Sequence, residues 1–299
     1  MDTANKRVER AKAPFSEPNS TGGKSESEVK GCSWKETEAV ADIGKASEFL
    51  VRYIRPQSFP VAVKMLQASD ELPDRARCPK RDLGFKVSLC QAIAMARRNG
   101  WTVAVQREDQ CCPHAAFVLG FVPGKGYLDG SFAEAVGLSP KERFSKLARH
   151  LSRLDFGKYN CMVAAPLQNT TFQPDVIVVY GNPAQVSRLV QAAVVMTGDV
   201  LTSTFSEGIA CSALIARPME TGTCQVVLSG AGDRYFALTQ DDELAFAMPL
   251  SKVDTILEGL EIGHKIVGHR YPTPFSMRLE GQLPPAYYQL LELLNNEEA

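Results

Sequence analysis

Three of the eight cysteines in this chain stand where a thiol could do chemistry. Cys112 and Cys211 each begin a predicted helix that follows a strand, and Cys90 lies on the apolar face of another predicted helix. The unsatisfied amides and the dipole of a helix N-terminus lower the pKa of a thiol, and thiolates ligate soft metals. We therefore predict that Cys90, Cys112 and Cys211 form a cofactor or metal site, either for an iron–sulfur cluster or for another thiophilic metal.

Several alternatives to this site remain open. A fourth ligand position would be vacant or filled by Cys161, Cys111, Cys224 or His114. The chain has no CxxC pair and no ferredoxin-type spacing, so ordinary buried cysteines explain the same residues. Cys112 and His114 could supply two ligands to a structural zinc, although no second pair of matching spacing follows. A thiol-dependent enzyme with Cys112 as nucleophile and a histidine as base is the remaining option.

A second candidate site combines glycines with an arginine. Gly230 and Gly232 precede Arg234 directly after a predicted strand, where backbone N–H groups and a guanidinium could receive an anion. Asn182 stands between an apolar strand and a helix, a place where open sheets often bind ligands. A tight turn and helix capping explain these residues equally well. The alternative function is a non-catalytic binder of a small anionic metabolite.

These residues must be positioned by alternating strands and helices, which predict a mixed α/β (α+β) fold. Apolar runs predict core strands at 61–66, 102–106, 176–180 and 225–228. Helices are expected at 37–53, 86–99, 252–266 and 285–295. Two more begin at capping boxes, Ser139 to Glu142 and Asn182 to Gln185, each with proline at the first helical position.

The order of these elements suggests two pseudo-repeated β-α-β-α halves. In the first, a strand and a helix end at Gly100, and Cys112 follows 12 positions later. In the second, a strand and a helix end at Gly198, and Cys211 follows 13 positions later. On this interpretation Cys112 and Cys211 are equivalent, and 200–206 corresponds to a strand.

The composition limits the class of protein. The 299 residues are 44% hydrophobic and carry a formal net charge of -1, with a pI near 6.5. This balance argues against nucleic-acid and membrane partners, since both attract a strongly positive surface. Residues 1–35 are polar and predict a disordered tail, and 36–299 predict one globular domain. No secretory leader or membrane span is visible, so we expect a cytoplasmic protein with reduced thiols. Homo-oligomerisation is left open.

The chain resembles domain-of-unknown-function family 169. The resemblance rests on VAVKML, LCQAIAMARRNG, EDQCCPHAAFVLGF, PDVIVVYGNPAQVSRLVQA, GIAC, LSGAGDR and AFAMPL, and it extends from about Phe59 to Pro274. It implies a soluble prokaryotic-type domain in which Cys90, Cys112 and Cys211 occupy the family's cysteine positions. Many members carry a further cysteine where this chain has Gly230. The resemblance does not point to a particular activity. Our leading expectation is a thiol-ligated cofactor with a redox or accessory role.

Overall fold

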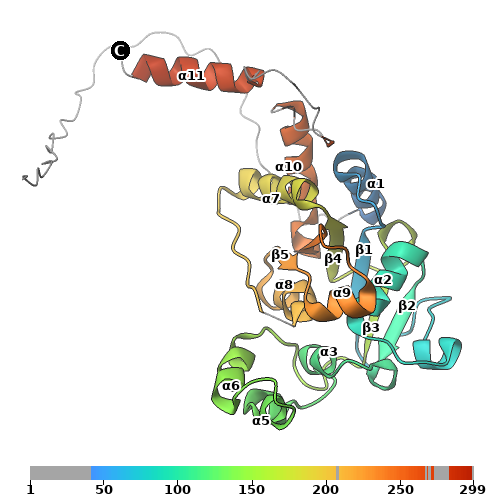
Figure 1. Ribbon diagram of the computed structural model, residues 1–299. Coiled ribbons are helices and arrows are strands. Elements are labelled where there is room, and N and C mark those ends of the chain that lie inside the picture. The colour runs from blue at the N-terminus through green and yellow to red at the C-terminus, as the bar shows by residue number, and fades with distance from the viewer. Residues whose placement is uncertain (1–41, 207–208, 267, 269–270, 273–282, 298–299) are drawn as a thin grey trace, which may run out of the picture. The chain divides into compact units, whose positions relative to one another are not determined.

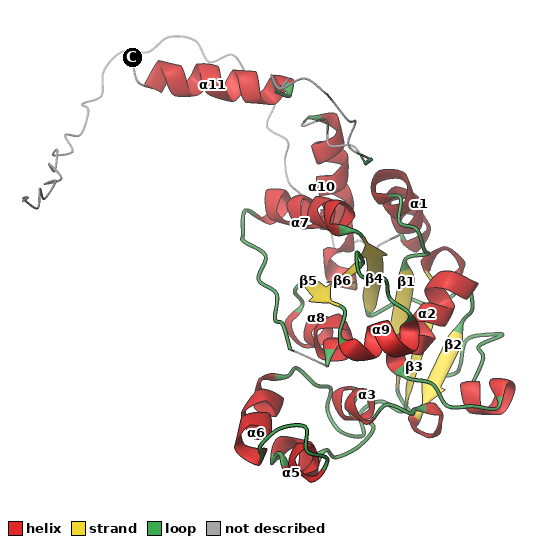
Figure 2. Cartoon of the chain, in the orientation of Figure 1, coloured by secondary structure: helices red, strands yellow, loops and turns green. Residues whose placement is uncertain are grey.

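The structure is a computed structural model that describes residues 42–206, 209–266, 268, 271–272 and 283–297. The predicted tail, 1–35, lies outside the described residues. Six strands of the described part form one sheet, drawn as arrows in Figure 1 and in yellow in Figure 2. Every pair of neighbouring strands is antiparallel. The fold is therefore mixed, as predicted.

The strands follow the order β2-β3-β1-β4-β6-β5 across the sheet. Their bounds are β1 Val61–Leu66, β2 Val103–Gln106, β3 Cys161–Pro166, β4 Val176–Gly181, β5 Gln225–Leu228 and β6 Leu244–Pro249. The four predicted core strands are confirmed as β1, β2, β4 and β5. In the centre of the sheet β1 pairs with β4, with Ala62 opposite Ile177.

Helices precede, connect and follow these strands. The α-helices are α1 Ile43–Ile54, α2 Leu89–Asn99, α3 Pro113–Val118, α4 Lys125–Leu128, α5 Ser131–Ala135, α6 Lys141–His150, α7 Pro183–Thr197, α8 Arg217–Thr221, α9 Ala231–Ala237, α10 Val253–Lys265 and α11 Pro285–Glu297. Shorter 3₁₀ or π turns are η1 Pro79–Leu83, η2 Arg107–Asp109, η3 Leu167–Asn169, η4 Ser212–Ala216 and η5 Leu250–Lys252. Among the described residues, no helix is long and apolar enough to cross a membrane.

Both faces of the sheet are covered by apolar side chains. Successive strand residues point to opposite faces, and β3 and β4 are buried along their whole length. One face forms a first core, which includes Val63, Met162 and Val178 and is covered by α2, α3 and η4. The other face forms a second core, which includes Ile177 and Phe246 and is covered by α1, α7 and α10. Burial on both faces explains the nearly continuous apolar runs in the sequence.

The strand order divides the sheet into two halves. From the edge to the centre the first half reads β2-β3-β1, and the second reads β5-β6-β4. Gly100 ends α2 three residues before β2, and Gly222 ends α8 three residues before β5. Helix α2 therefore corresponds to η4–α8, and α3 corresponds to α9.

This topology supports two halves but corrects the predicted alignment between them. Cys90 lies ten residues before Gly100, and Cys211 lies eleven before Gly222, so these two cysteines are equivalent. Cys112 precedes α3 directly, as Gly230 precedes α9. The predicted pairing of Cys112 with Cys211 was wrong because α7 is an extra helix that covers the other face.

Two local predictions also need correction. Helix α6 has Pro140 as its N-cap with no side-chain hydrogen bond, so the capping box predicted from Ser139 does not form. Segment 200–206 is irregular and not a strand. Its side chains nevertheless reach β5, because the Ser203 hydroxyl accepts the N–H of Val226 at 2.8 Å. The box at Asn182 is confirmed, with hydrogen bonds in both directions to Gln185.

Candidate functional site

Cys90 is positioned by a well-capped helix. Ser88 and Gln91 form a reciprocal capping box that begins α2, and Cys90 lies in its first turn. The half-buried Cys90 Sγ is 3.0 Å from Ser88 Oγ and 3.7 Å from the carbonyl oxygen of Gly232. The first turn of α2 is thus held against the first turn of α9.

Cys112 and Cys211 lie near Cys90 and on the same side of the sheet. Both are half-buried and pack against the first core. Cys112 precedes α3, and its backbone N–H donates to Oε1 of Gln110 at 3.0 Å. Negative charge on Cys112 or Cys90 would raise the pKa of Cys211. Cys112 and Cys211 thus share one side of the sheet with α2, which carries Cys90, and we refer to this region as the thiol neighbourhood.

The thiols of Cys90 and Cys211 are not acidic. Burial raises the pKa of Cys90 to about 12, although a hydrogen bond from Ser88 opposes the shift. Burial raises the pKa of Cys211 well above its ordinary value, and nearby Cys112 and Asp233 add to the effect. The expectation of a lowered pKa at Cys211 was wrong, because loss of hydration outweighs the helix dipole.

Two ring side chains complete this neighbourhood. Burial, together with the nearby thiols of Cys112 and Cys211, raises the pKa of Tyr127 to about 12. The ring of His114 meets the ring of Tyr127 edge-on at 5.6 Å between centroids. Burial lowers the pKa of His114, which keeps its imidazole neutral at neutral pH. A neutral imidazole is the form that ligates metals.

Three buried polar atoms near the starts of α3 and α9 have no hydrogen-bond partner among the described residues. They are Nε2 of Gln110, Nδ1 of His114 and Oγ of Ser229. Gln110 and His114 flank Cys112, and Ser229 directly precedes Gly230. An unsatisfied buried polar group costs about 1–3 kcal/mol, so groups of this kind in one region indicate a missing binding partner.

The residues proposed as a fourth ligand lie at different places relative to the three thiols. Cys161 belongs to a third apolar cluster with Cys78, and Cys224 belongs to the second core. Both therefore lie away from the three thiols. Cys111 is exposed, and its Sγ contacts Oε1 of Gln91 at 3.9 Å. His114 is the candidate that combines burial with an unpartnered nitrogen.

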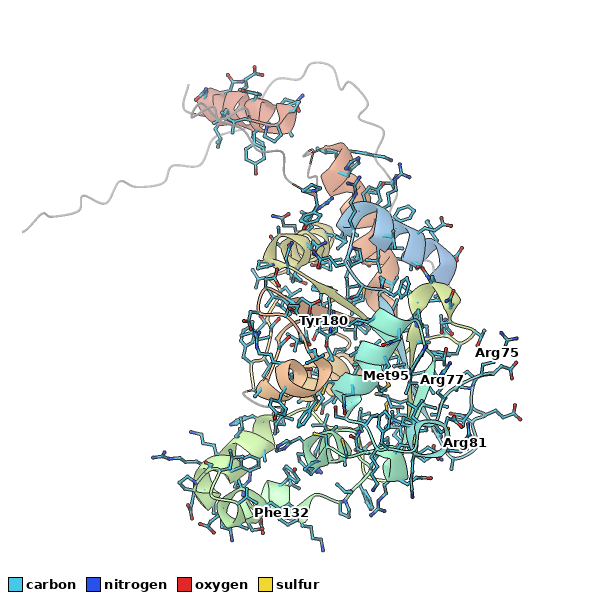
Figure 3. The ribbon with its side chains drawn as sticks, turned by 45° about the vertical axis from the view of Figure 1, so that its right-hand side comes forward. Arg75, Arg77, Arg81, Met95, Phe132 and Tyr180 are labelled. Atoms are coloured by element: carbon cyan, nitrogen blue, oxygen red, sulfur yellow. The ribbon has the colours of Figure 1, made fainter. Side chains whose placement is uncertain are left out.

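A buried charged network borders the thiols, and sequence reasoning did not predict it. Arg97 is 1% exposed and forms two hydrogen bonds with the carboxylate of Glu243, at 2.6 and 3.0 Å. Its guanidinium lies 4.0 Å from the ring centroid of Tyr180, which is labelled beside α2 in Figure 3. Asp233 is also buried, and burial raises its pKa. This network ties α2 to the second half of the sheet.

The predicted anion site is engaged in contacts within the chain. Arg234 donates to the carboxylate of Asp241 at 2.5 Å. The Asp233 carboxylate accepts the N–H of Gly230 at 3.0 Å, and the carbonyl of Gly232 contacts Cys90. Asn182 caps α7 and donates to the hydroxyl of Tyr271 at 2.7 Å. The structure places Gly230 and Gly232 beside the thiols, and it gives Arg234 and Asn182 structural partners.

No group of three or more His, Cys, Asp or Glu side chains in the described residues is arranged to hold a metal ion. A single ion gathers all of its ligand atoms around one point, whereas an iron–sulfur cluster binds each cysteine through a different iron. The three thiols therefore do not form a preformed site for a single metal ion.

Comparison with known proteins defines the family. The model of the family DUF169, described as uncharacterised ArCR, matches residues 50–259. The chain belongs to DUF169. The DUF169 region extends from α1 into α10 and includes the whole sheet together with the three cysteines.

A DUF169 relative supports this assignment. The chain is 27% identical over 206 residues to uncharacterized protein MJ0308 of Methanocaldococcus jannaschii. The alignment covers 67% of this chain and 86% of that protein. No solved structure matches the chain significantly.

Proposed function

We propose that Cys90, Cys112 and Cys211 hold a thiophilic cofactor, with an iron–sulfur cluster preferred over a single metal ion. The role would be redox or accessory to another enzyme. One observation carries the proposal: three thiols from separate helix starts lie on the same side of the sheet, where Cys90 contacts the first turn of α9 and Cys112 and Cys211 pack against the first core. Cysteine thiolates are the usual ligands of such clusters.

The fourth position in this proposal belongs to His114. Its Nδ1 is buried without a hydrogen-bond partner in the described part of the chain, and its ring lies beside Tyr127. Burial lowers its pKa, so the imidazole is ready to donate an electron pair at neutral pH. Clusters with mixed cysteine and histidine ligands are known, and histidine raises their reduction potential.

The first experiment is anaerobic purification and reconstitution of the full chain with iron and sulfide. Expected results are bound iron, acid-labile sulfide and absorbance near about 400 nm. Alanine variants of Cys90, Cys112 and Cys211 should each lose most of this signal. The matched control is Cys78→Ala, which removes a buried thiol from the third apolar cluster. This variant should keep the iron, sulfide and absorbance of the wild type. A wild-type protein without colour and sulfide would overturn the proposal.

The pH dependence of reconstitution gives an independent test. Thiols must lose protons to ligate a metal, and burial raises the pKa of Cys90 to about 12. Cofactor uptake should therefore increase from about pH 7 to about pH 9, with protons released. Uptake that is independent of pH would argue that these thiols are not the ligands.

The alternatives receive less support from the same residues. A Cys112 nucleophile requires a base that is free to accept its proton, and no hydrogen bond from Cys112 Sγ to a histidine is found in the described residues. An anion bound at Gly230 and Gly232 would require Arg234, whose guanidinium is paired with Asp241. The cofactor proposal requires no ion pair of the described residues to break.

A further inference from the structure

A pocket of about 360 Å³ lies away from the thiols, beside the second core. It is lined by the end of α7, segment 199–202, α8, the two residues before β5, and the start of α10. Leu201, Cys224 and Ile256 connect it with the second core. Its volume lies within the range of small-molecule sites, which begins at about 300 Å³.

Two cations line this pocket without a carboxylate partner. Neither Arg217 nor Lys252 forms a salt bridge within the described residues. Nε of Arg217 is buried and has no hydrogen-bond partner there. Arg217 is half-buried, and leaving its buried Nε–H without an acceptor costs free energy, so this N–H together with the positive charge points to an anion as the partner.

The remaining lining residues indicate which chemical groups the bound anion has besides its charge. Val194, Leu201 and Ile256 present apolar surface, and five threonines add hydroxyl groups around it. Those threonines are Thr197, Thr202, Thr221, Thr223 and Thr255. Asp199, exposed at the rim, is the acidic residue of the lining. Two cations against one carboxylate leave a single positive charge, which suits a monoanion better than a phosphate dianion.

We propose that this pocket binds a small aliphatic carboxylate. Arg217 offers the planar fork of donors that matches a carboxylate, and Lys252 adds a second charge. The aliphatic chain of the ligand packs against Val194, Leu201 and Ile256. This site is separate from the thiol neighbourhood and does not depend on any cofactor there.

The thermal stability of the full chain at constant ionic strength tests the proposal. The probes are butyrate, hexanoate, butyramide and inorganic phosphate. A ligand that binds only the folded state raises Tm in proportion to its occupancy. Butyrate and hexanoate should raise Tm at millimolar concentrations, and butyramide, which lacks the charge, should not. No shift with either carboxylate, or an equal shift with phosphate, would overturn the assignment.

Variants locate the binding. Arg217→Met should weaken carboxylate binding about tenfold or more, because it removes a charge-assisted hydrogen bond. Lys252→Met, at the second cation, should weaken binding about threefold and keeps the test valid if the first variant folds poorly. The matched control is Arg234→Met, which removes an arginine paired with Asp241 outside the pocket. Binding that survives both pocket variants, or fails in the control, would contradict the proposed site.

Discussion

The two halves of the sheet reach the same strand order by different routes. In the first half, α2 is a regular helix between β1 and β2, and α4, α5 and α6 are added before β3. In the second half, α7 is added after β4, and the counterpart of α2 is a π turn, η4, that continues into α8. The extra helices therefore occur at different places in the two halves. The elements next to the thiols, in contrast, have a counterpart in each half.

The comparison also separates the residues of the site. Cys90 and Cys211 stand at equivalent positions of the two halves. The position in the second half that is equivalent to Cys112 is occupied by Gly230. The site is therefore built from a symmetric pair of thiols and one thiol contributed by the first half alone. His114, which follows Cys112 in the first half, also lacks a histidine counterpart, since Gly232 stands at the matching position.

The largest expected effect concerns the ion pair that joins the halves. Glu243→Leu should lower the free energy of unfolding by about 3 kcal/mol, because it leaves the buried charge of Arg97 unpaired. Arg97→Met should lower it by less, because Glu243 keeps its contact with Arg98 at 3.3 Å. The double variant should lose less than the sum of the two. Urea denaturation of the four proteins measures the coupling, and additive losses would show that the halves do not depend on this pair.

Restoring the missing thiol should make the two halves alike. Gly230 has φ −73° and ψ 173°, an extended conformation open to any residue. We expect Gly230→Cys to slow the loss of the reconstituted cofactor to a chelator about tenfold, since it supplies a fourth thiolate. Gly230→Ser is the control for the added side chain. Equal rates in the two variants would refute a role for this position.

The glycines that end the equivalent helices should behave alike. Gly100 and Gly222 have φ 73° and 66°, in the left-handed region that favours glycine. A Cβ would meet nothing within 4 Å at Gly222 and only Phe59 at 3.6 Å at Gly100. Alanine at either position should therefore cost about 1 kcal/mol, all of it conformational. Thermal denaturation measures both costs, and a difference above about 1 kcal/mol would contradict their equivalence.

The smallest expected effect is the pH dependence of the stability that the Arg97–Glu243 ion pair contributes. Burial alone would raise the pKa of Glu243, but hydrogen bonds from Arg97 and Gln240 and the charges of Arg97 and Arg98 lower it below 4.5. A lowered folded-state pKa adds stability above the unfolded value, and this stability is lost as pH falls through the folded value. The stability difference between wild type and Glu243→Gln should shrink from pH 5 towards about pH 3. A constant difference would contradict the ion pair.

The sequence was sufficient for elements whose signals are local. Strand β4 follows from its apolar run, and the start of α7 follows from Asn182 and Gln185, because each signal lies within a few residues. Ser139 carried the same kind of signal, yet Pro140 took the N-cap position and the box did not form. A capping pattern alone does not determine which residue becomes the N-cap.

Long-range features were not predictable in this way. The alignment of the halves failed because Gly198 and Gly222 look alike in sequence, and only the sheet shows that α8 occupies the place of α2. Arg217 and Lys252 were missed for the same reason. They are far apart along the chain, and the fold alone brings them to one pocket.

The π turn η4 sets the rotational phase between the two sites. Cys211 precedes it, and Arg217 follows it at the start of α8. One extra residue wound into a helix turns everything beyond it by about 100° relative to an unbroken α-helix. The helix can thereby direct Cys211 towards the thiols and Arg217 towards the pocket. Winding the same residues of η4 into a regular α-helix would rotate Arg217 by about 100° relative to Cys211.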